Sequence, residues 1–143
     1  MKKIYRKGYT QGVYDMFHIG HLNLINNAKK HCNYLMVAVN SDELVYEYKQ
    51  KTPVISEEQR RYIVENIKAV DEAVIANTLD KVEQYKKYGF DVIFIGDDWK
   101  GNDRWKQTEI ELRAYGVDVV YLPHTQGISS TMLRQTNNNQ VSE

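Results

Sequence analysis

Tyr34-Leu35-Met36-Val37-Ala38-Val39 is a continuous apolar run of the length of a strand. Such runs are typical of parallel sheets that helices cover on both faces, because neither side of the strand meets water. Asp91-Val92-Ile93-Phe94-Ile95 is a second run of this kind, and shorter strand patterns lie at residues 8–14, 72–76 and 117–122. The strands alternate with helical patterns. We therefore predict an α/β fold with a five-stranded, mainly parallel and doubly wound sheet.

The segments between these strands carry helix signals. Helices are predicted from His18 or Ile19 to about residue 31, at 56–67, at 80–88 and at 105–115, with a short helix after Asn40-Ser41-Asp42. Ser56 and Gln59 fit the spacing of a capping box at the start of the second of these helices. No repeat or linker divides the chain, so we expect a single Rossmann-like domain over residues 1–135. The polar, Asn-rich tail, residues 136–143, is expected to be disordered.

The composition excludes several classes of protein. The 143 residues suffice for one domain, and 19 basic against 19 acidic side chains leave no net charge. A general nucleic-acid binder usually has a basic excess, so we expect no nucleic-acid partner. The single cysteine, Cys32, excludes an internal disulfide, and its apolar neighbours predict a buried thiol.

The apolar pattern also bears on location. No apolar run approaches the ~20 residues of a membrane span, so we expect no membrane partner. The N-terminal stretch Met1-Lys2-Lys3-Ile4-Tyr5-Arg6 lacks the apolar core of a signal peptide. We therefore expect a cytoplasmic protein.

The strongest chemical signal lies in Gly12-Val13-Tyr14-Asp15-Met16-Phe17-His18-Ile19-Gly20-His21. A predicted strand ends in a turn, and two histidines follow three positions apart, on one face of the first turn of a helix. Gly20 leaves room for phosphates, and the helix N-terminus favours an anion. Imidazoles could donate to an α-phosphate and to a departing pyrophosphate, without a covalent nucleophile. The alternatives are surface or capping histidines or metal ligands, although no third His or Cys follows at a conventional ligand spacing.

Two further segments could bind phosphates. Gly127-Ile128-Ser129-Ser130-Thr131 offers a tight turn, hydroxyl groups and a helix N-terminus after the last strand, although an ordinary helix cap has the same pattern. A basic loop with Lys49 and Lys51 precedes a helix that carries Arg60 and Arg61. These cations could close over a triphosphate, or they could form a solvated charged surface.

Together with Gly96-Asp97-Asp98-Trp99, these motifs resemble the cytidylyltransferase family within the HxGH nucleotidyltransferase superfamily, most closely the small bacterial glycerol-3-phosphate cytidylyltransferases. The likeness extends over residues 4–134. HxGH alone is shared with several adenylyltransferases and with class I aminoacyl-tRNA synthetases, whereas the combination is far more specific. The resemblance implies an enzyme that transfers CMP from CTP to a phosphomonoester and releases pyrophosphate. Glycerol 3-phosphate is the first choice, giving CDP-glycerol for teichoic-acid-like or capsular polymers.

The resemblance also implies roles for individual residues. The catalytic residues would be His18, His21 and Lys51. The nucleotide would contact Gly12, Val13, Tyr14, His18, Ile19, Gly20, His21, Lys51, Asp98, His124, Thr125, Gln126, Gly127, Ile128, Ser129, Ser130 and Thr131. The acceptor substrate would contact Lys49, Lys81 and Lys68. Mg²⁺ would accompany CTP, held mainly by phosphate oxygens and water rather than by a protein metal site, and the protein would form a homodimer.

Three positions depart from the family pattern. His124 and Lys68 stand where the family usually has arginine, and Gln126 replaces a glutamate. Histidine and lysine keep a donor but lack the planar, two-pronged grip of guanidinium, so the acceptor stays open among other phosphorylated alcohols. These include a sugar-alcohol phosphate, phosphocholine and phosphoethanolamine. The rival functions are an ATP-dependent adenylyltransferase of the same fold and a nucleotide-binding regulatory module without turnover.

Overall fold

The computed structural model describes residues 4–123. Five strands form one sheet in it: β1 (Tyr5–Gly12), β2 (Cys32–Asn40), β3 (Glu72–Ala76), β4 (Val92–Gly96) and β5 (Asp118–Leu122). Their order is β3-β2-β1-β4-β5, and every neighbouring pair is parallel. The predicted five-stranded α/β fold is confirmed, with a wholly parallel sheet. The predicted tail and the end of the predicted domain lie outside the described residues.

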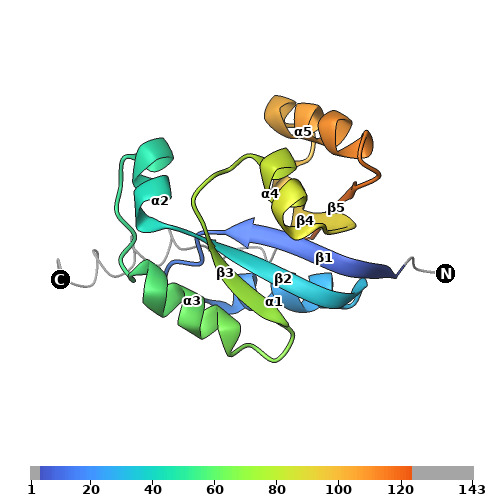
Figure 1. Ribbon diagram of the computed structural model, residues 1–143. Coiled ribbons are helices and arrows are strands. Elements are labelled where there is room, and N and C mark those ends of the chain that lie inside the picture. The colour runs from blue at the N-terminus through green and yellow to red at the C-terminus, as the bar shows by residue number, and fades with distance from the viewer. Residues whose placement is uncertain (1–3, 124–143) are drawn as a thin grey trace.

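Helices alternate with the strands and cover both faces of the sheet. They are α1 (Ile19–Lys29), α2 (Asp42–Lys49), α3 (Glu57–Glu65), α4 (Lys81–Tyr88) and α5 (Asp103–Arg113), with a 3₁₀ turn, η1 (Asp97–Trp99), after β4. Figure 1 shows α1 and α3 on one face and α4 and α5 on the other, with α2 beyond the end of β2. This doubly wound arrangement follows from the short parallel crossovers, each of which needs a helix to return the chain.

The hydrophobic core has two halves because β2 is buried on both of its faces. Val37 points into the half that contains Ile25 of α1 and Val64 of α3, and all three side chains are fully buried. The next residue along the strand, Ala38, points into the other half with Leu112 of α5. A strand with two buried faces has no reason to alternate apolar and polar residues, which explains the continuous run in the sequence.

The sheet is tightly packed at its centre, where β1 runs between β2 and β4. A Cβ atom on Gly8 would lie 2.5 Å from Cε2 of Phe94 and 2.8 Å from Sγ of Cys32. Both distances are below van der Waals contact, so the position has room for glycine alone. Cys32 is buried and its thiol donates to the Ala28 carbonyl, as the prediction of a buried thiol requires.

The start of α3 differs from the prediction. Ser56 is the N-cap residue, but its side chain makes no capping hydrogen bond, so the predicted capping box is wrong. Asp42 of α2 caps the start of α3 instead, since the Glu57 N–H donates to its carboxylate. The Asp42 N–H donates in return to the Glu57 carboxylate at 3.0 Å. Helices α2 and α3 therefore cap each other, which no local pattern around Ser56 could indicate.

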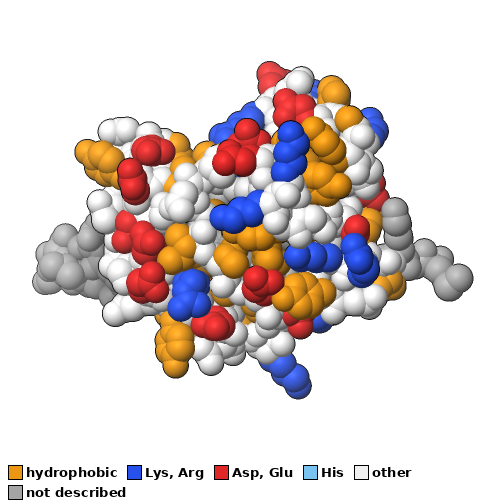
Figure 2. Space-filling view, in the orientation of Figure 1, with side chains coloured by type: hydrophobic (Ala, Val, Ile, Leu, Met, Phe, Trp, Pro, Cys, Tyr) orange, Lys and Arg blue, Asp and Glu red, His pale blue; other side chains and the backbone are white. Residues whose placement is uncertain are grey.

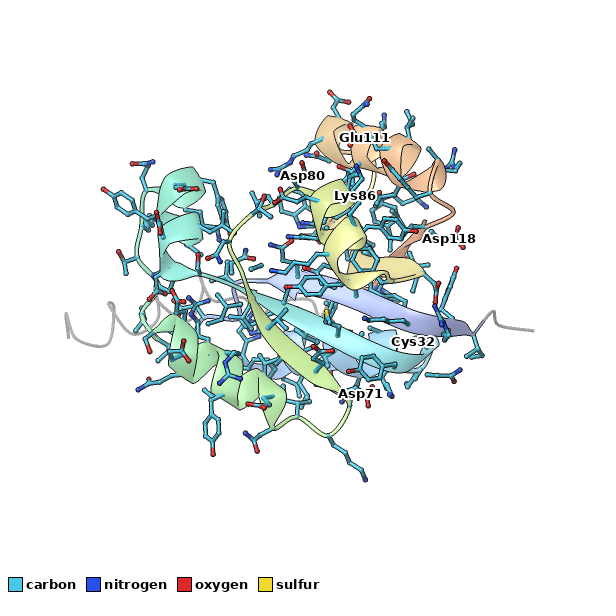
Figure 3. All side chains as sticks on the ribbon, viewed as in Figure 1. Cys32, Asp71, Asp80, Lys86, Glu111 and Asp118 are labelled. Atoms are coloured by element: carbon cyan, nitrogen blue, oxygen red, sulfur yellow. The ribbon has the colours of Figure 1, made fainter. Side chains whose placement is uncertain are left out.

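The sheet topology places the ligand edge beside β1. The chain passes from β1 to β2 and β3 on one side, and then returns to β4 and β5 on the other. Ligands of such sheets bind where this order reverses, at the carboxyl ends of the strands. Figure 3 labels Cys32, Asp71 and Asp118 at the opposite, amino ends of β2, β3 and β5.

The surface is mixed in charge. Figure 2 shows acidic and basic side chains interspersed over the visible face, without a continuous basic stripe. Within residues 4–123 no helix combines the length and apolar character that crossing a membrane requires.

Candidate active site

A cleft of about 470 Å³ opens at the carboxyl edge of the sheet, beside β1. The ends of β1 and β4, the turn before α1, and residues of α2, α4 and α5 line it. Six residues predicted for the site are among the lining: Gly12, Val13, Tyr14, His21, Lys49 and Lys81. A larger hollow of about 640 Å³ lies over α1, but none of the predicted site residues lines it. The cleft at the carboxyl edge is therefore the candidate site.

The turn from β1 into α1 has an unusual backbone. Tyr14 and Met16 both have positive φ angles, of 57° and 50°, which non-glycine residues rarely adopt. Asp15 between them is buried, and its carboxylate accepts the N–H groups of Val54 and Ile55 at 2.8 and 2.9 Å. Backbone strain of this kind persists only where the surrounding contacts fix it. The segment that joins α2 to α3 thus holds the turn in place.

His18 and His21 cap the helix that they begin. His18 is the N-cap residue, and its Nδ1 accepts the Gly20 N–H at 3.0 Å. Nδ1 of His21 accepts the His18 N–H at 3.2 Å, which completes a reciprocal capping box made of two imidazoles. The two rings stack with centroids 3.8 Å apart. The capping alternative is therefore correct for the Nδ1 atoms, and it leaves both Nε2 atoms for other partners.

These hydrogen bonds also determine which nitrogen of each imidazole carries the proton. An Nδ1 that accepts a backbone N–H is unprotonated, so the proton of the neutral ring is on Nε2. Burial, and then the neighbouring His18, lowers the pKa of His21 to about 4, and burial lowers the pKa of His18. Both rings are consequently neutral Nε2–H donors near pH 7. Nε2 of His18 is buried and has no hydrogen-bond partner among the described residues. An anion at the N-terminus of α1 would satisfy it.

Lys81 lines the cleft from the start of α4. Its ammonium donates to Oε1 of Gln11 and to the Leu79 carbonyl, and it lies 5.6 Å from the ring centroid of Trp105. Burial, and then the charge of Arg104, lowers the pKa of Lys81 to about 7. Near pH 7 the cleft therefore holds a buried, partly protonated amine whose charged form an anionic ligand would stabilise.

Arg60 does not belong to an exposed basic cluster, contrary to both interpretations of its position in the sequence. Its side chain is fully buried and donates to the carbonyl oxygens of Val13, Asn40 and Ile55 at 2.7–2.8 Å. It also pairs with Asp42. The guanidinium thus ties together the end of β1, the end of β2 and the segment before α3.

The remaining predicted residues lie in various places. Lys51 is exposed on the segment between α2 and α3, outside the cleft lining. Lys68 is exposed on the connection into the amino end of β3, and the structure does not bring it to the cleft. Ile19 and Gly20 lie in the first turn of α1, and Asp98 is exposed in η1. The predicted residues His124, Thr125, Gln126, Gly127, Ile128, Ser129, Ser130 and Thr131 lie outside the described residues.

Sequence reasoning missed several lining residues. Gln11 and Thr10 were identifiable as polar residues at the carboxyl end of a buried central strand. Tyr48 had no signal of its own, and Arg104 and Trp105 on α5 come from a helix far along the chain. Only the fold brings that helix to the cleft.

Residues 9–136 match a family model described as cytidylyltransferase-like. The chain belongs to this family. This cytidylyltransferase-like chain is accordingly a nucleotidyltransferase.

Curated relatives cover nearly the whole cytidylyltransferase-like chain. A glycerol-3-phosphate cytidylyltransferase of Bacillus spizizenii is 37% identical over 131 residues, which are 91% of this chain and 95% of the relative. The Staphylococcus aureus protein of the same name is 33% identical over 127 residues, 88% of this chain and 90% of the relative. An FAD synthase of Korarchaeum cryptofilum is 33% identical over 136 residues, 93% of this chain and 92% of the relative.

A solved structure has the same fold. The lipopolysaccharide core biosynthesis protein of Thermoplasma volcanium superposes with a TM-score of 0.73 at 24% sequence identity, over 85% of this chain and 99% of that one. The agreement supports the parallel order of the strands around β1.

Proposed function

We propose that the protein transfers CMP from CTP to a phosphomonoester, with glycerol 3-phosphate as the first choice of acceptor, and produces CDP-glycerol and pyrophosphate. The observation that carries the proposal is the pair of neutral imidazoles at the N-terminus of α1, with Nε2 of His18 buried and unpartnered. Relatives named as glycerol-3-phosphate cytidylyltransferases support the choice of acceptor.

The reaction needs positioning and charge stabilisation rather than a covalent nucleophile. An oxygen of the acceptor phosphate attacks the α-phosphorus of CTP in line, and the bond from that phosphorus to the pyrophosphate oxygen breaks. Negative charge grows on the α-phosphate and on the leaving group. The Nε2–H groups of His18 and His21, fixed by their Nδ1 hydrogen bonds, donate to these oxygens. The positive end of the α1 dipole acts in the same direction.

The other roles carried from the family remain part of this proposal. Lys51 contacts CTP from the segment that Asp15 ties to the histidine turn. Lys49 and Lys81 bind the acceptor phosphate from the cleft wall. Residues 124–131 hold the nucleotide. Lys68 is at the amino end of the sheet, outside the cleft lining, so it does not contact the acceptor within one chain.

Mg²⁺ fits this site as a companion of the triphosphate. Within residues 4–123 no group of three or more His, Cys, Asp or Glu side chains could hold a metal ion on its own. Asp15, the carboxylate of the cleft lining, already accepts two backbone N–H groups. Mg²⁺ would therefore be held mainly by phosphate oxygens and water, where it neutralises phosphate charge.

A second candidate function has its own support. FAD synthases of Korarchaeum cryptofilum and Ferroglobus placidus are 33% and 36% identical to the chain. An ATP-dependent adenylyltransferase would use the same histidine turn, since HxGH chemistry acts on the phosphates and not on the base. The cleft would then bind a larger acceptor.

We further propose that the protein forms a homodimer, and that its CDP-linked product is a precursor of teichoic-acid-like or capsular polymers.

The proposal is tested by pyrophosphate release with Mg²⁺ and either CTP or ATP. The acceptor panel contains glycerol 3-phosphate, a sugar-alcohol phosphate, phosphocholine, phosphoethanolamine and flavin mononucleotide. We expect turnover with CTP and glycerol 3-phosphate. CTP turnover with a different acceptor would change the pathway, ATP turnover with the flavin would support the second candidate, and no turnover with any pair would contradict both.

Variants connect the assay to the site. His18→Asn and His21→Asn each remove an Nε2–H donor and should lower kcat by about 10²–10³. His31→Asn is the matched control, because His31 follows α1 at the amino edge of the sheet. It should keep full activity.

A further inference from the structure

The cleft has a cationic end that the histidine turn does not explain. The lining contains three cationic side chains, Lys49, Lys81 and Arg104, and one carboxylate, Asp15. That carboxylate is buried and accepts two backbone N–H groups. A protein without net charge thus concentrates positive charge in one cavity. Such a concentration points to an anionic ligand at this end.

Arg104 stands at a position that helix energetics disfavour. It is the second residue of α5, and its N–H donates to the side chain of the N-cap residue, Asn102, at 3.0 Å. The first turn of a helix is its positive end, so a cation there is unfavourable for the helix itself. Among residues 4–123 no ion pair compensates for it. Its placement therefore does not serve helix stability.

Arg104 lines the cleft together with Tyr48 of α2 and Lys81 of α4. Burial lowers the pKa of Lys81 on α4 most, and the charge of Arg104 lowers it further, whereas burial raises the pKa of Tyr48 on α2 and Arg104 only opposes that rise. The neighbouring side chain, Trp105, lies over the Lys81 ammonium. Two basic side chains from different helices therefore line one cleft beside the ring of Trp105, and their charges repel each other. An anion between them would remove that repulsion. The carboxylate of Asp80, the residue before Lys81, already accepts the Glu83 N–H as the N-cap of α4.

In-line transfer separates the two phosphates that the enzyme must hold. In the proposed reaction the leaving pyrophosphate lies on the side of the α1 N-terminus, where the histidines would donate. The attacking phosphate must approach the α-phosphorus from the opposite side. Lys81 and Arg104 line the cleft from α4 and α5, which cover the face of the sheet opposite to α1 (Figure 1).

We propose that Arg104 is a specificity-determining residue that binds the dianionic phosphate of the acceptor, together with Lys81. This rests on the proposed function, because it assigns one end of the same cleft to the acceptor. Guanidinium offers two parallel N–H donors to a phosphate, which lysine cannot reproduce. The residue thus selects phosphomonoesters over neutral alcohols and over phosphodiesters.

The test compares Arg104→Gln and Arg104→Lys with the wild type. Arg113→Gln is the matched control, since Arg113 is an exposed arginine at the far end of the same helix. Three quantities are measured: the KM for the acceptor, the KM for CTP, and the Kd of inorganic phosphate from tryptophan fluorescence without nucleotide. Arg104→Gln should raise the acceptor KM and the phosphate Kd by roughly 10–100-fold. Arg104→Lys should give values of the acceptor KM and the phosphate Kd between those of the wild type and Arg104→Gln. The CTP KM of these variants and all values of the control should stay within about 3-fold of the wild type.

The outcomes separate this inference from the proposed function. Loss of phosphate affinity in Arg104→Gln supports the anion site even if the wild type turns over no CTP, which would remove the proposed function alone. CTP turnover with an unchanged acceptor KM and an unchanged phosphate Kd in Arg104→Gln would overturn the inference alone. A rise in the CTP KM without a rise in the acceptor KM would also overturn it, because Arg104 would then serve the nucleotide. Arg104→Gln should fold normally, since it removes a cation from the positive end of a helix.

Discussion

The imidazoles of His18 and His21 stack with their planes 24° apart, and each Nδ1 accepts a backbone N–H of the same helical turn. The capping box therefore fixes both the orientation and the tautomer of each ring before a ligand arrives. Preorganised donors need no rearrangement during the reaction, which is the main source of electrostatic catalysis.

The stability of the fold should depend on pH through His21. The pKa of this residue is lowered to about 4 in the folded chain, against about 6.5 in an unfolded one. The contribution of His21 to the free energy of unfolding is fully present above pH 6.5 and is lost as pH falls towards 4. In this range the unfolded chain binds more protons at His21 than the folded chain does. Urea denaturation between pH 4 and 7 measures this slope. The His21→Gln variant should show a shallower slope than the wild type, and equal slopes would contradict the assignment.

Lys81 should give a slope at the opposite end of the pH range. Its pKa is lowered to about 7 in the folded chain, against about 10.4 when unfolded, so the unfolded chain binds more protons between these values. The free energy of unfolding should therefore receive a rising contribution from pH 7 to 9. Lys81→Met should remove it and should be more stable than the wild type at pH 7. A less stable variant at pH 7 would show that the ammonium is well compensated.

Asp15→Asn tests the attachment between the histidine turn and the segment before α3. An amide has one acceptor oxygen where the carboxylate has two, and its NH₂ group faces the N–H of Val54 or Ile55. One buried donor loses its partner, so the free energy of unfolding should fall by about 1–3 kcal/mol. Chemical denaturation gives this value. Activity should fall further than stability alone explains, because the histidine turn loses a fixed neighbour; activity that follows the folded fraction would argue against such a link.

Two adjacent arginines on α3 should differ sharply. Arg60→Met leaves three carbonyl oxygens and Asp42 without their donor, and we expect a loss of about 3 kcal/mol or more. Arg61→Met removes only exposed pairs with Glu58 and Glu65, and should change stability by about 0.5 kcal/mol or less. Thermal and urea unfolding of both variants make the comparison. Similar losses would mean that the Arg60 hydrogen bonds contribute little.

The fold was predictable from the sequence because its strongest signal is local. A strand with two buried faces is apolar along most of its length, and both β2 and β4 are recognisable in the sequence as continuous apolar runs. The α2–α3 contact was not predictable, since Asp42 and Glu57 cap across two helices while Ser56 has the expected pattern and no capping bond.

The histidine turn was predictable in position but not in detail. Capping was one of the alternatives that the sequence left open, but histidine is an uncommon N-cap residue, so nothing local decided that both Nδ1 atoms would accept backbone N–H groups. The burial of Arg60 was hidden because its partners are carbonyl oxygens on three remote segments. Arg104 carries no pattern at all, and only the packing of α5 beside α4 brings it to the cleft.

Because β1 lies in the middle of the sheet, the sheet cannot be completed until β4 has been synthesised. β1 is synthesised well before β4, yet Thr10 on β1 donates to the Phe94 carbonyl of β4, 84 positions further along the chain. Until β4 emerges, a nascent chain can form only the β1-β2-β3 half of the sheet, with β1 as its exposed edge. The turn that carries the two histidines then follows an edge strand whose unpaired backbone groups favour aggregation. Chains truncated before β4 should therefore form insoluble material instead of a weakly active half-enzyme.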